Sequence, residues 1–333
     1  MIIPPGIAAL PRFGLIDGPS PLAPLRRFSA AIGGDAEVEV WVKREDLLPL
    51  AFGGNKLRNL EFLVGAALAA GADTLITSGR RWSNHARLTA AAGARAGLTV
   101  ELVLTGPPPA VGAEGPNQRL DELLGARVHV TEHEDRDERA ALVARIEGEA
   151  HAAGRRPFVI GVGGTGPIGA AGQVLAGLEV ADQLAAAGVG GSTIVVPSAT
   201  GGTHGGVLTG VSLAGGPIHD VAGISVAAPA ATLRPTILGI LDGLVELVGQ
   251  RVPDARVVLD DDQLGDGYGC PTAAADEAAR LLARTEGILV DPIYTAKALA
   301  GLIARARDGR LRGPVVFWHA GGTPGIFEAL ERG

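Results

Sequence analysis

Short apolar runs alternate along this chain with longer stretches rich in alanine and leucine. Continuous apolar runs such as Thr193–Val196 and Val315–Trp318 are typical of strands that are buried on both faces of a sheet. Strands that alternate with helices predict an α/β fold of parallel sheets with crossover helices. The predicted strands are Glu37–Lys43, Asp73–Thr77, Thr99–Leu104, Arg127–Thr131, Pro157–Gly161, Ser192–Pro197, His219–Val226, Ala255–Leu259 and Pro314–Trp318. The predicted helices include Leu57–Ala70, Asn84–Ala96, Arg136–Ala153, Gly169–Ala187 and Thr272–Glu286.

The composition sets limits on partners and location. At 333 residues and 47% apolar content, the chain is long enough for two domains. A net charge of −7 with scattered arginines argues against a nucleic acid or an anionic membrane as partner. The single cysteine, Cys270, allows no intrachain disulfide, and the N-terminus lacks the pattern of a secretion signal. No apolar run approaches the roughly 20 residues of a membrane helix, so we expect a cytoplasmic protein.

One lysine stands out because lysine is rare here. The chain has three lysines (Lys43, Lys56 and Lys297) against 26 arginines, and Lys56 follows Gly53-Gly54-Asn55 directly. Arginine cannot form an imine, whereas lysine can when burial lowers its pKa. Lys56 therefore points to an enzyme that uses pyridoxal phosphate (PLP).

A second glycine-rich turn, Ser198–Gly206, follows a buried strand and opens a helix. Backbone N–H groups at a helix N-terminus bind anions, and Thr200 and Thr203 add hydroxyl donors. The chain has no G-x-x-x-x-G-K-[ST] sequence, which argues against a nucleotide P-loop. A single phosphate held by backbone groups suits PLP.

A third glycine-rich segment, Gly161–Gly169, contains G-x-G-x-x-G twice and raises the alternative of a Rossmann oxidoreductase. That fold needs an acidic residue at the end of the next strand to bind the ribose. Glu179 and Asp182 fall inside the following predicted helix, and the next strand ends at Pro197-Ser198. The pattern therefore argues against dinucleotide binding.

Further motifs narrow the chemistry. Asp291-Pro292 is typical of a helix start, which would place Tyr294 and Thr295 in its first turn. The seven histidines lack the spacing of metal ligands, so we predict no metal site. A G-x-S-x-G nucleophile elbow is also missing from the sequence.

Several segments together resemble one family. They read GGNKLRNLEF, SGRRWSNHAR, GVGGTGPIG, SATGGTHGG, GYGCP, EGILVDPIYTAKA and HAGGTPGIF. In order and spacing the chain closely resembles the D-cysteine desulfhydrase and 1-aminocyclopropane-1-carboxylate (ACC) deaminase family, over essentially its whole length. The resemblance implies the two-domain, parallel-sheet PLP fold type II, which is tryptophan-synthase-β-like. It also implies that residues 50–162 form the smaller domain, and that residues 1–49 and 163–333 form the larger, PLP-binding one.

The resemblance implies roles toward the cofactor for residues in four segments. Lys56 would bind PLP covalently and act as the base at the substrate α-carbon. Asn84 would lie near the phenolic oxygen of PLP, and Thr295 would face the pyridine nitrogen. The turn of Thr200, Gly201, Gly202 and Thr203 would hold the phosphate.

It likewise implies roles toward a small amino-acid substrate. Ser83, Asn84 and His85 would hold the substrate carboxylate at their helix N-terminus, as expected for an anion. Tyr268 and Tyr294 match active-site tyrosines of the family. We predict that Tyr294 protonates the leaving group or positions the substrate.

Three positions separate the two activities of the family. ACC deaminases typically carry other residues where this chain has His85, His204 and Thr295. ACC deaminases typically carry glutamate where this chain has Thr295. A carboxylate there keeps the pyridine nitrogen of PLP protonated, so the ring withdraws electrons strongly, which suits opening of the cyclopropane ring. The neutral hydroxyl of Thr295 does not do this, and β-elimination of a good leaving group needs less electron withdrawal. We therefore expect a D-cysteine desulfhydrase, with ACC deaminase as the alternative.

The chain departs from the family at Arg80, Arg81, Trp82, Asn59 and Gly166. The first three are expected at the mouth of the substrate site, with Trp82 as a substrate-binding residue. Our hypothesis is that they change substrate choice toward an anionic or bulkier β-substituent. The arginine pair could then bind a sulfonate such as that of cysteate.

The expected reaction begins when the substrate amine displaces Lys56 from PLP. Lys56 then removes the α-proton, a β-leaving group such as sulfide is expelled, and the final products are pyruvate and ammonia. PLP would supply the electron sink, and the protein would supply orientation and electrostatics. A homodimer is expected from the family. A PLP-binding protein that has lost catalysis stays open as an alternative of another class.

Overall fold

A computed structural model describes residues 2–32, 38–107, 114–132, 135–216, 218–253 and 256–331. Its strands are β1 Leu22–Pro24, β2 Val38–Arg44, β3 Thr74–Arg80, β4 Thr99–Thr105, β5 Arg127–Thr131, β6 Pro157–Ile160, β7 Ser192–Ser198, β8 Ile218–Ser225, β9 Val258–Asp260 and β10 Gly313–His319. Its α-helices are α1 Pro5–Ala8, α2 Arg26–Ala31, α3 Lys56–Ala69, α4 Asn84–Ala96, α5 Pro116–Leu123, α6 Arg136–Ala152, α7 Pro167–Ala186, α8 Gly202–Ala214, α9 Ala230–Val248, α10 Ala273–Glu286, α11 Thr295–Arg307 and α12 Thr323–Glu331. Two short 3₁₀ helices are η1 Glu45–Leu47 and η2 Val162–Gly164.

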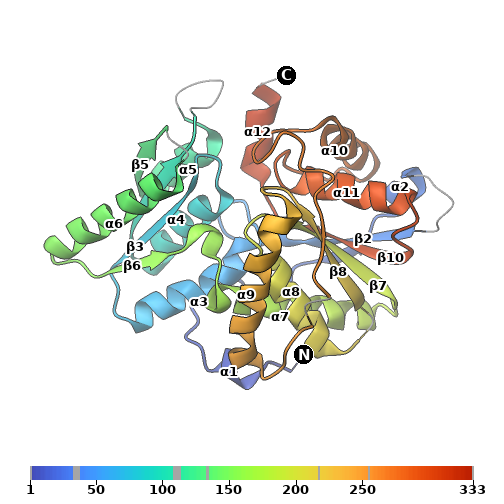
Figure 1. Cartoon of the computed structure of the whole chain (residues 1–333), viewed down its shortest axis with the longest axis horizontal. Helices are drawn as coiled ribbons and strands as arrows, with labels where there is room; N and C mark the ends of the chain where they lie inside the picture. The colour runs from blue at the N-terminus through green and yellow to red at the C-terminus, as the bar shows by residue number, and fades with distance from the viewer. Residues whose placement is uncertain are drawn as a thin grey trace.

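The strands form two sheets that lie side by side (Figure 1). The larger has six strands in the order β1-β2-β10-β7-β8-β9, and the smaller has four in the order β5-β4-β3-β6. All described pairs are parallel except β1 with β2, which are antiparallel. The expected parallel α/β class is thus the observed one.

Helices cover both faces of the larger sheet. Successive side chains of β7 alternate between two core clusters, with Val195 in one and Ile194 and Val196 in the other. The first cluster is completed by α2, α10 and α11, and the second by α7, α8 and α9. Burial on both faces explains why these strands are continuous apolar runs.

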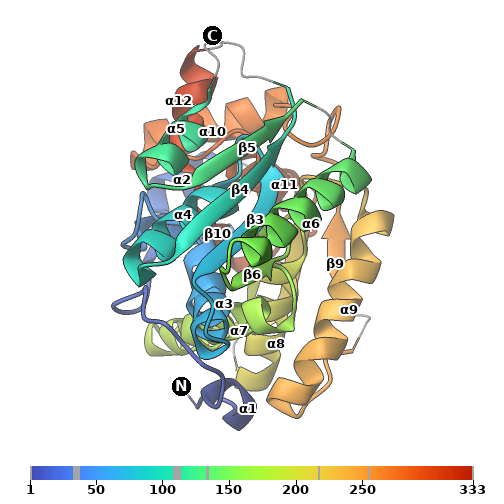
Figure 2. The same cartoon turned by 90° about the vertical axis from the view of Figure 1, so that its left-hand side faces the viewer.

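The smaller sheet is covered by α3, α4 and α5 on one face and by α6 on the other. Ile76 and Val103 pack against Ile146 of α6, whereas Leu75 and Leu102 pack into the cluster of the opposite face. Figure 2 faces this sheet and shows α6 in front of its strands. The carboxyl ends of its strands point in one direction because the four strands are parallel.

The strand predictions differ from the structure at their ends. β3 continues past the predicted end at Thr77 because its pairing with β4 extends to Arg80. β1, a three-residue edge strand that ends in a proline, is not among the predicted strands. The predicted starts at Glu37 and Ala255 lie outside the described residues. Over the described ranges, no helix is both long and apolar enough to cross a membrane.

A buried ionic network ties α3 to the larger sheet. The Nε atom of Arg58 donates to Oε2 of Glu45 at 2.6 Å, and its Nη2 atom donates to Oε1 of Glu179 at 2.9 Å. Lys43 donates to Glu179 and, at 2.7 Å, to the carbonyl oxygen of Ser20. Burial alone would lower the pKa of Arg58, but Glu45 and Glu179 raise it above its ordinary value. These bonds link β2, η1, α3 and α7.

Glycine allows α3 and α7 to touch. A Cβ atom at Gly172 would lie 1.9 Å from the carbonyl oxygen of Arg58, closer than any real contact. The absence of a side chain at this position lets the two backbones pack directly. The network around Arg58 therefore sits where the two sheets are joined.

We expect Glu45→Ala to lower the free energy of unfolding by about 3–5 kcal/mol, because it leaves the guanidinium of Arg58 buried with one partner fewer. Urea denaturation measures the loss. Glu39→Ala is the matched control, because Glu39 lies on the adjoining strand β2 and is exposed. A loss no larger than that of the control would show that the network adds no net stability.

Candidate functional site

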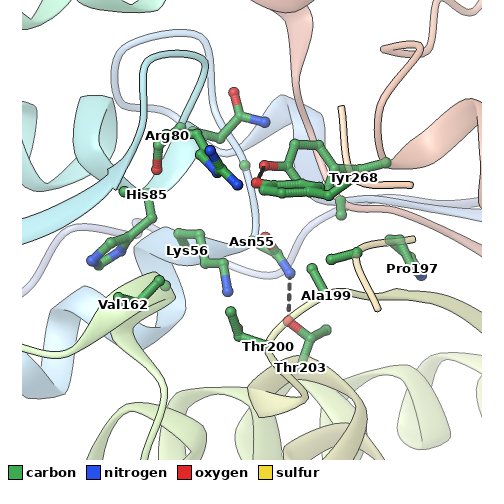
Figure 3. Close-up of a pocket in the computed structure, with 18 of the residues that line it drawn as sticks. Asn55, Lys56, Arg80, His85, Val162, Pro197, Ala199, Thr200, Thr203 and Tyr268 are labelled. Atoms are coloured by element: carbon green, nitrogen blue, oxygen red, sulfur yellow. Dashed lines mark hydrogen bonds between the residues drawn. The ribbon is translucent and has the colours of Figure 1, made fainter. Parts of the chain in front are cut away.

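A cavity of about 280 Å³ lies between the two sheets. Its walls come from the residues that follow β3 and β6 in the smaller sheet, and β7, β8 and β10 in the larger. Active sites of parallel sheets gather at the carboxyl ends of strands, and here two such edges meet. Figure 3 shows side chains from both sides converging on Lys56.

The structure brings most of the predicted site residues together in this cavity. Those that line it are Lys56, Ser83, Asn84, His85, Thr200, Gly201, Thr203, Tyr268, Tyr294 and Thr295. Trp82 and Gly202 are not among the lining residues. Trp82 instead packs its ring edge-on against Tyr268, with centroids 5.8 Å apart. Gly202 is the first residue of α8.

A strained turn positions Lys56 at the start of α3. Residues 51–54 all have positive φ angles, of 45°, 65°, 65° and 128°. A Cβ atom at Gly53 would lie 2.2 Å from the carbonyl oxygen of Asp46, so only glycine fits there. Ala51 and Phe52 also have positive φ angles, which cost free energy because each residue carries a side chain. Such backbone strain is typical of functional sites.

The amine of Lys56 is easier to deprotonate than an ordinary lysine. Burial lowers its pKa from 10.5 to about 8. Lys56 is also the first residue of α3, where a cation is disfavoured by the helix dipole. Near neutral pH a useful fraction of this amine is therefore an uncharged nucleophile.

The turn between β7 and α8 is arranged to donate hydrogen bonds. Gly201 caps α8 in the left-handed region, with a φ of 83°. Oγ1 of Thr200 accepts from the hydroxyl of Thr165 at 2.6 Å, and Oγ1 of Thr203 accepts from the amide of Asn55 at 2.8 Å. Each threonine hydroxyl thus keeps its own hydrogen for another acceptor. Together with the helix N-terminus, the turn suits a phosphate.

The N-terminus of α4 presents a second set of polar groups. Ser83 caps the helix, and its Oγ accepts from the backbone N–H of Ala86 at 3.1 Å. Oδ1 of Asn84 accepts from Nη1 of the buried Arg87 at 2.8 Å and from Nδ2 of Asn117 at 3.3 Å. Because Oδ1 of Asn84 accepts these two hydrogen bonds, its Nδ2 group is the part of the amide that can donate into the cavity.

The hydrogen bonds of His85 define its tautomer. The hydroxyl of Thr77 donates to the carbonyl oxygen of Ile160 at 2.8 Å, so at 3.1 Å it must accept from Nε2 of His85. Nδ1 then carries a lone pair, and burial together with the charge on Lys56 lowers the pKa of His85 to about 3. The neutral ring is directed toward Val162 (Figure 3). An anion at α4 would therefore meet the backbone N–H of His85, not its ring.

Two tyrosines form the wall opposite. Their hydroxyl groups, on Tyr268 and Tyr294, are hydrogen-bonded to each other. Burial raises the pKa of both phenols above the ordinary value, that of Tyr294 by more. Both therefore stay protonated near neutral pH and can donate a hydrogen bond or a proton.

Asp291 organises the start of α11. Its carboxylate accepts backbone N–H groups of Ile293, Tyr294 and Thr295 at 2.8–3.0 Å. It also accepts from the hydroxyl of Thr295, which in turn accepts from the backbone N–H of Asp291. Burial raises the pKa of this carboxyl group. The prediction that Tyr294 lies in the first turn is wrong, because the helix begins at Thr295 and Tyr294 caps it.

Sequence reasoning missed four side chains at the site. Asn55 and Arg87 orient Thr203 and Asn84, and both stand inside segments already singled out, beside Lys56 and after His85. Arg136 and Arg139 line the cavity from α6, a stretch that carries no motif.

Two of the residues at which the chain departs from the family, Arg81 and Asn59, do not line the cavity. Nε of Arg81 donates to the carbonyl oxygen of Gly106, and Asn59 bonds Gly164 and Gln173.

The donor groups of the cavity fit a phosphorylated aldehyde. A buried amine of lowered pKa lies between a hydroxyl-bearing helix N-terminus and an amide donor. Figure 3 shows Lys56 directed toward Thr200. A phosphate would sit on the hydroxyl turn and the aldehyde would meet the amine.

Comparison with known proteins agrees with this assignment. The family model described as "Pyridoxal-phosphate dependent enzyme" matches residues 14–321. Proteins named D-cysteine desulfhydrase, from Yersinia pestis (strain Pestoides F) and Yersinia enterocolitica serotype O:8 / biotype 1B (strain NCTC 13174 / 8081), are 38% and 39% identical over 331 residues, or 96% of each chain.

Solved structures give the same result. One described as an ACC deaminase homologue is 36% identical, has a TM-score of 0.89, and matches over 98% of this chain and 96% of its own. A threonine deaminase from T.th., 21% identical with a TM-score of 0.66 over 91% of this chain and 92% of its own, shares the fold alone. The fold type implied by the sequence resemblance is confirmed.

We expect the amine of Lys56 in the cofactor-free protein to titrate near pH 8, since burial disfavours its charged form. Competitive acetylation read by mass spectrometry gives its reactivity as a function of pH. In urea, where burial is lost, the midpoint should return toward 10.5. An unshifted midpoint in the folded protein would contradict the desolvated environment described above.

Proposed function

The chain belongs to the pyridoxal-phosphate-dependent enzymes, and from this premise we propose that it catalyses β-elimination from D-cysteine. The products are pyruvate, sulfide and ammonia. The observation that carries the proposal is the position of Lys56 between a phosphate-type turn and a pair of protonated tyrosines. Relatives named D-cysteine desulfhydrase align over 96% of the chain and support it.

The residues of the cavity can be assigned to parts of the cofactor. Thr200 and Thr203, with the backbone of Gly201 and Gly202, would bind the phosphate. Nδ2 of Asn84 would donate to the phenolic oxygen, Thr295 would face the pyridine nitrogen, and Lys56 would make the covalent attachment. When bound, pyridoxal phosphate supplies an electron sink for the negative charge that develops at the substrate α-carbon.

The substrate carboxylate would bind at the N-terminus of α4. The Ser83 hydroxyl accepts a cap bond and keeps its hydrogen for this anion. Backbone N–H groups of Asn84 and His85 complete the set, as anion binding at helix termini requires. Binding at this point would hold the α-carbon next to Lys56.

Lys56 and Tyr294 would then move the protons. Lys56, released from its covalent attachment when the substrate amine takes its place, would take the proton from the α-carbon, which its lowered pKa allows near neutral pH. The Cβ–S bond breaks, and its electron pair leaves with the sulfur. Tyr294, hydrogen-bonded to Tyr268, gives that sulfur a proton and releases sulfide. Water hydrolyses the aminoacrylate to pyruvate and ammonia.

Opening of the ACC ring is the second candidate, because an ACC deaminase homologue is 36% identical. The residue proposed to face the pyridine nitrogen argues against it. That residue is Thr295, which carries a neutral hydroxyl that donates to the carboxylate of Asp291. We therefore place β-elimination first.

The purified enzyme is expected to release pyruvate from D-cysteine, and Lys56→Arg should lower the rate at least about 100-fold because it removes the base while keeping a charge. L-Cysteine and ACC are assayed in parallel. Release of 2-oxobutyrate from ACC without pyruvate from D-cysteine would reverse the order of the two candidates.

Thr200→Val and Thr203→Val should each raise the dissociation constant for PLP about tenfold or more, since each removes a hydrogen bond to a charged group. Thr209→Val is the matched control, because Thr209 lies on α8, as Thr203 does, and donates to the carbonyl oxygen of Gly205. Absorbance titration of the cofactor-free variants measures the constants. Equal dissociation constants for PLP in all three variants would indicate that the phosphate binds in another part of the cavity.

We also propose that the enzyme acts as a homodimer, as the family resemblance implies, which light scattering of the purified protein tests. We further propose a cytoplasmic location, which fractionation of the cells that produce it tests.

We propose that residues 50–162 form the smaller domain and that residues 1–49 and 163–333 form the larger one. The four-stranded sheet, whose strands run from Thr74 to Ile160, supports this division.

A further inference from the structure

Three arginines line the cavity. Arg80 is the last residue of β3, and Arg136 and Arg139 are one turn apart at the start of α6. Figure 3 shows Arg80 on the far side of Lys56 from Thr200. Arg80 therefore lies away from the turn assigned to the cofactor phosphate.

The three cations are close enough to act on one another. Burial lowers the pKa of Arg139, and the charges of Arg80 and Arg136 lower it further. The guanidinium of Arg80 lies 5.9 Å from the ring centroids of both Trp82 and Tyr268, which holds it at the tyrosine wall. Repulsion among these charges is a cost that a bound anion would remove.

The position of two of these arginines adds to that cost. Cations are disfavoured in the first turn of a helix, yet Arg136 opens α6 and Arg139 follows it. The acidic residues of the same turn, Asp137 and Glu138, are exposed and do not line the cavity. The exposed Arg136 and the half-buried Arg139 thus line the cavity, whereas the two acidic side chains beside them do not.

We propose that Arg80, Arg136 and Arg139 bind an anionic group at the β-position of the substrate. This rests on the proposed function and narrows its substrates to alanines whose β-substituent carries negative charge. The thiolate of D-cysteine is the smallest member of this class, and a sulfonate or phosphate ester is a larger one. The expected arginine pair is corrected, because Arg81 bonds the carbonyl oxygen of Gly106 and does not line the cavity.

The reaction balances for a sulfonate. The Cα–H and Cβ–S bonds of cysteate break, the proton goes to Lys56, and the electron pair of Cβ–S leaves with sulfur as sulfite. A double bond forms between Cα and Cβ. Water then converts the aminoacrylate to pyruvate and ammonia, with no oxidant or reductant required.

The test compares an anionic with a neutral β-substituent in the holoenzyme. KM is measured for cysteate and for β-chloroalanine, each as both enantiomers. The ratio of the two KM values should rise about tenfold in Arg139→Ala and in Arg136→Ala, as for a lost charge-assisted bond. Arg139→Lys should restore part of it. Arg145→Ala is the control on the same helix, because Arg145 is exposed and pairs with Glu149 outside the cavity.

Two outcomes would overturn the proposal. An unchanged ratio of the KM values for cysteate and β-chloroalanine would show that the arginines do not recognise the β-substituent. An equal rise of both KM values would assign them to the α-carboxylate, which every substrate carries.

A binding measurement separates this proposal from the proposed function. Calorimetry compares 3-sulfopropanoate with propanoate on the wild type and on Arg139→Ala. Tighter binding of the sulfonate that is lost in the variant supports the arginine site even where no substrate turns over, and such inactivity would count against β-elimination alone. Equal binding of the two compounds would overturn the arginine site.

Discussion

The pairing of Arg58 with Glu45 and Glu179 is the interaction on which the site depends. Arg58 lies two residues after Lys56, on the first turn of α3. Its two carboxylate partners belong to the segment after β2 and to α7, so one buried cation fixes a helix of the smaller sheet against the larger. Removing one partner of such a group costs several kcal/mol. The position of Lys56 is thereby set by charges that never touch the cavity.

The chemistry of the cavity follows from the meeting of two sheet edges. Each parallel sheet brings the loops at its carboxyl ends to one side, and the two sides face each other across Lys56. The smaller sheet contributes the α4 N-terminus and the arginines, and the larger contributes the hydroxyl turn and the tyrosines. Groups able to donate hydrogen bonds to an anion therefore lie on both sides of one amine.

Much of this could be predicted from the sequence, because loops after strands carry their polar residues in recognisable order. The Thr200 turn was predicted in that way, whereas Lys56 was predicted from the rarity of lysine and Ser83 from the family resemblance, and the structure brings the three together. Orientation could not be predicted. The tautomer of His85 depends on Thr77 and the donor face of Asn84 on Arg87, contacts that only packing creates. The place of Arg139 likewise depends on how α6 crosses the sheet.

The turn before Lys56 has a consequence for how this protein can change. Ala51 and Phe52 sit in a region that costs a residue with a side chain about 1–2 kcal/mol, and glycine would relieve that cost. A less strained turn is thus one substitution away, but glycine would also let the segment before the reactive amine adopt more conformations. Selection for thermal stability and selection for turnover would pull these two positions in opposite directions.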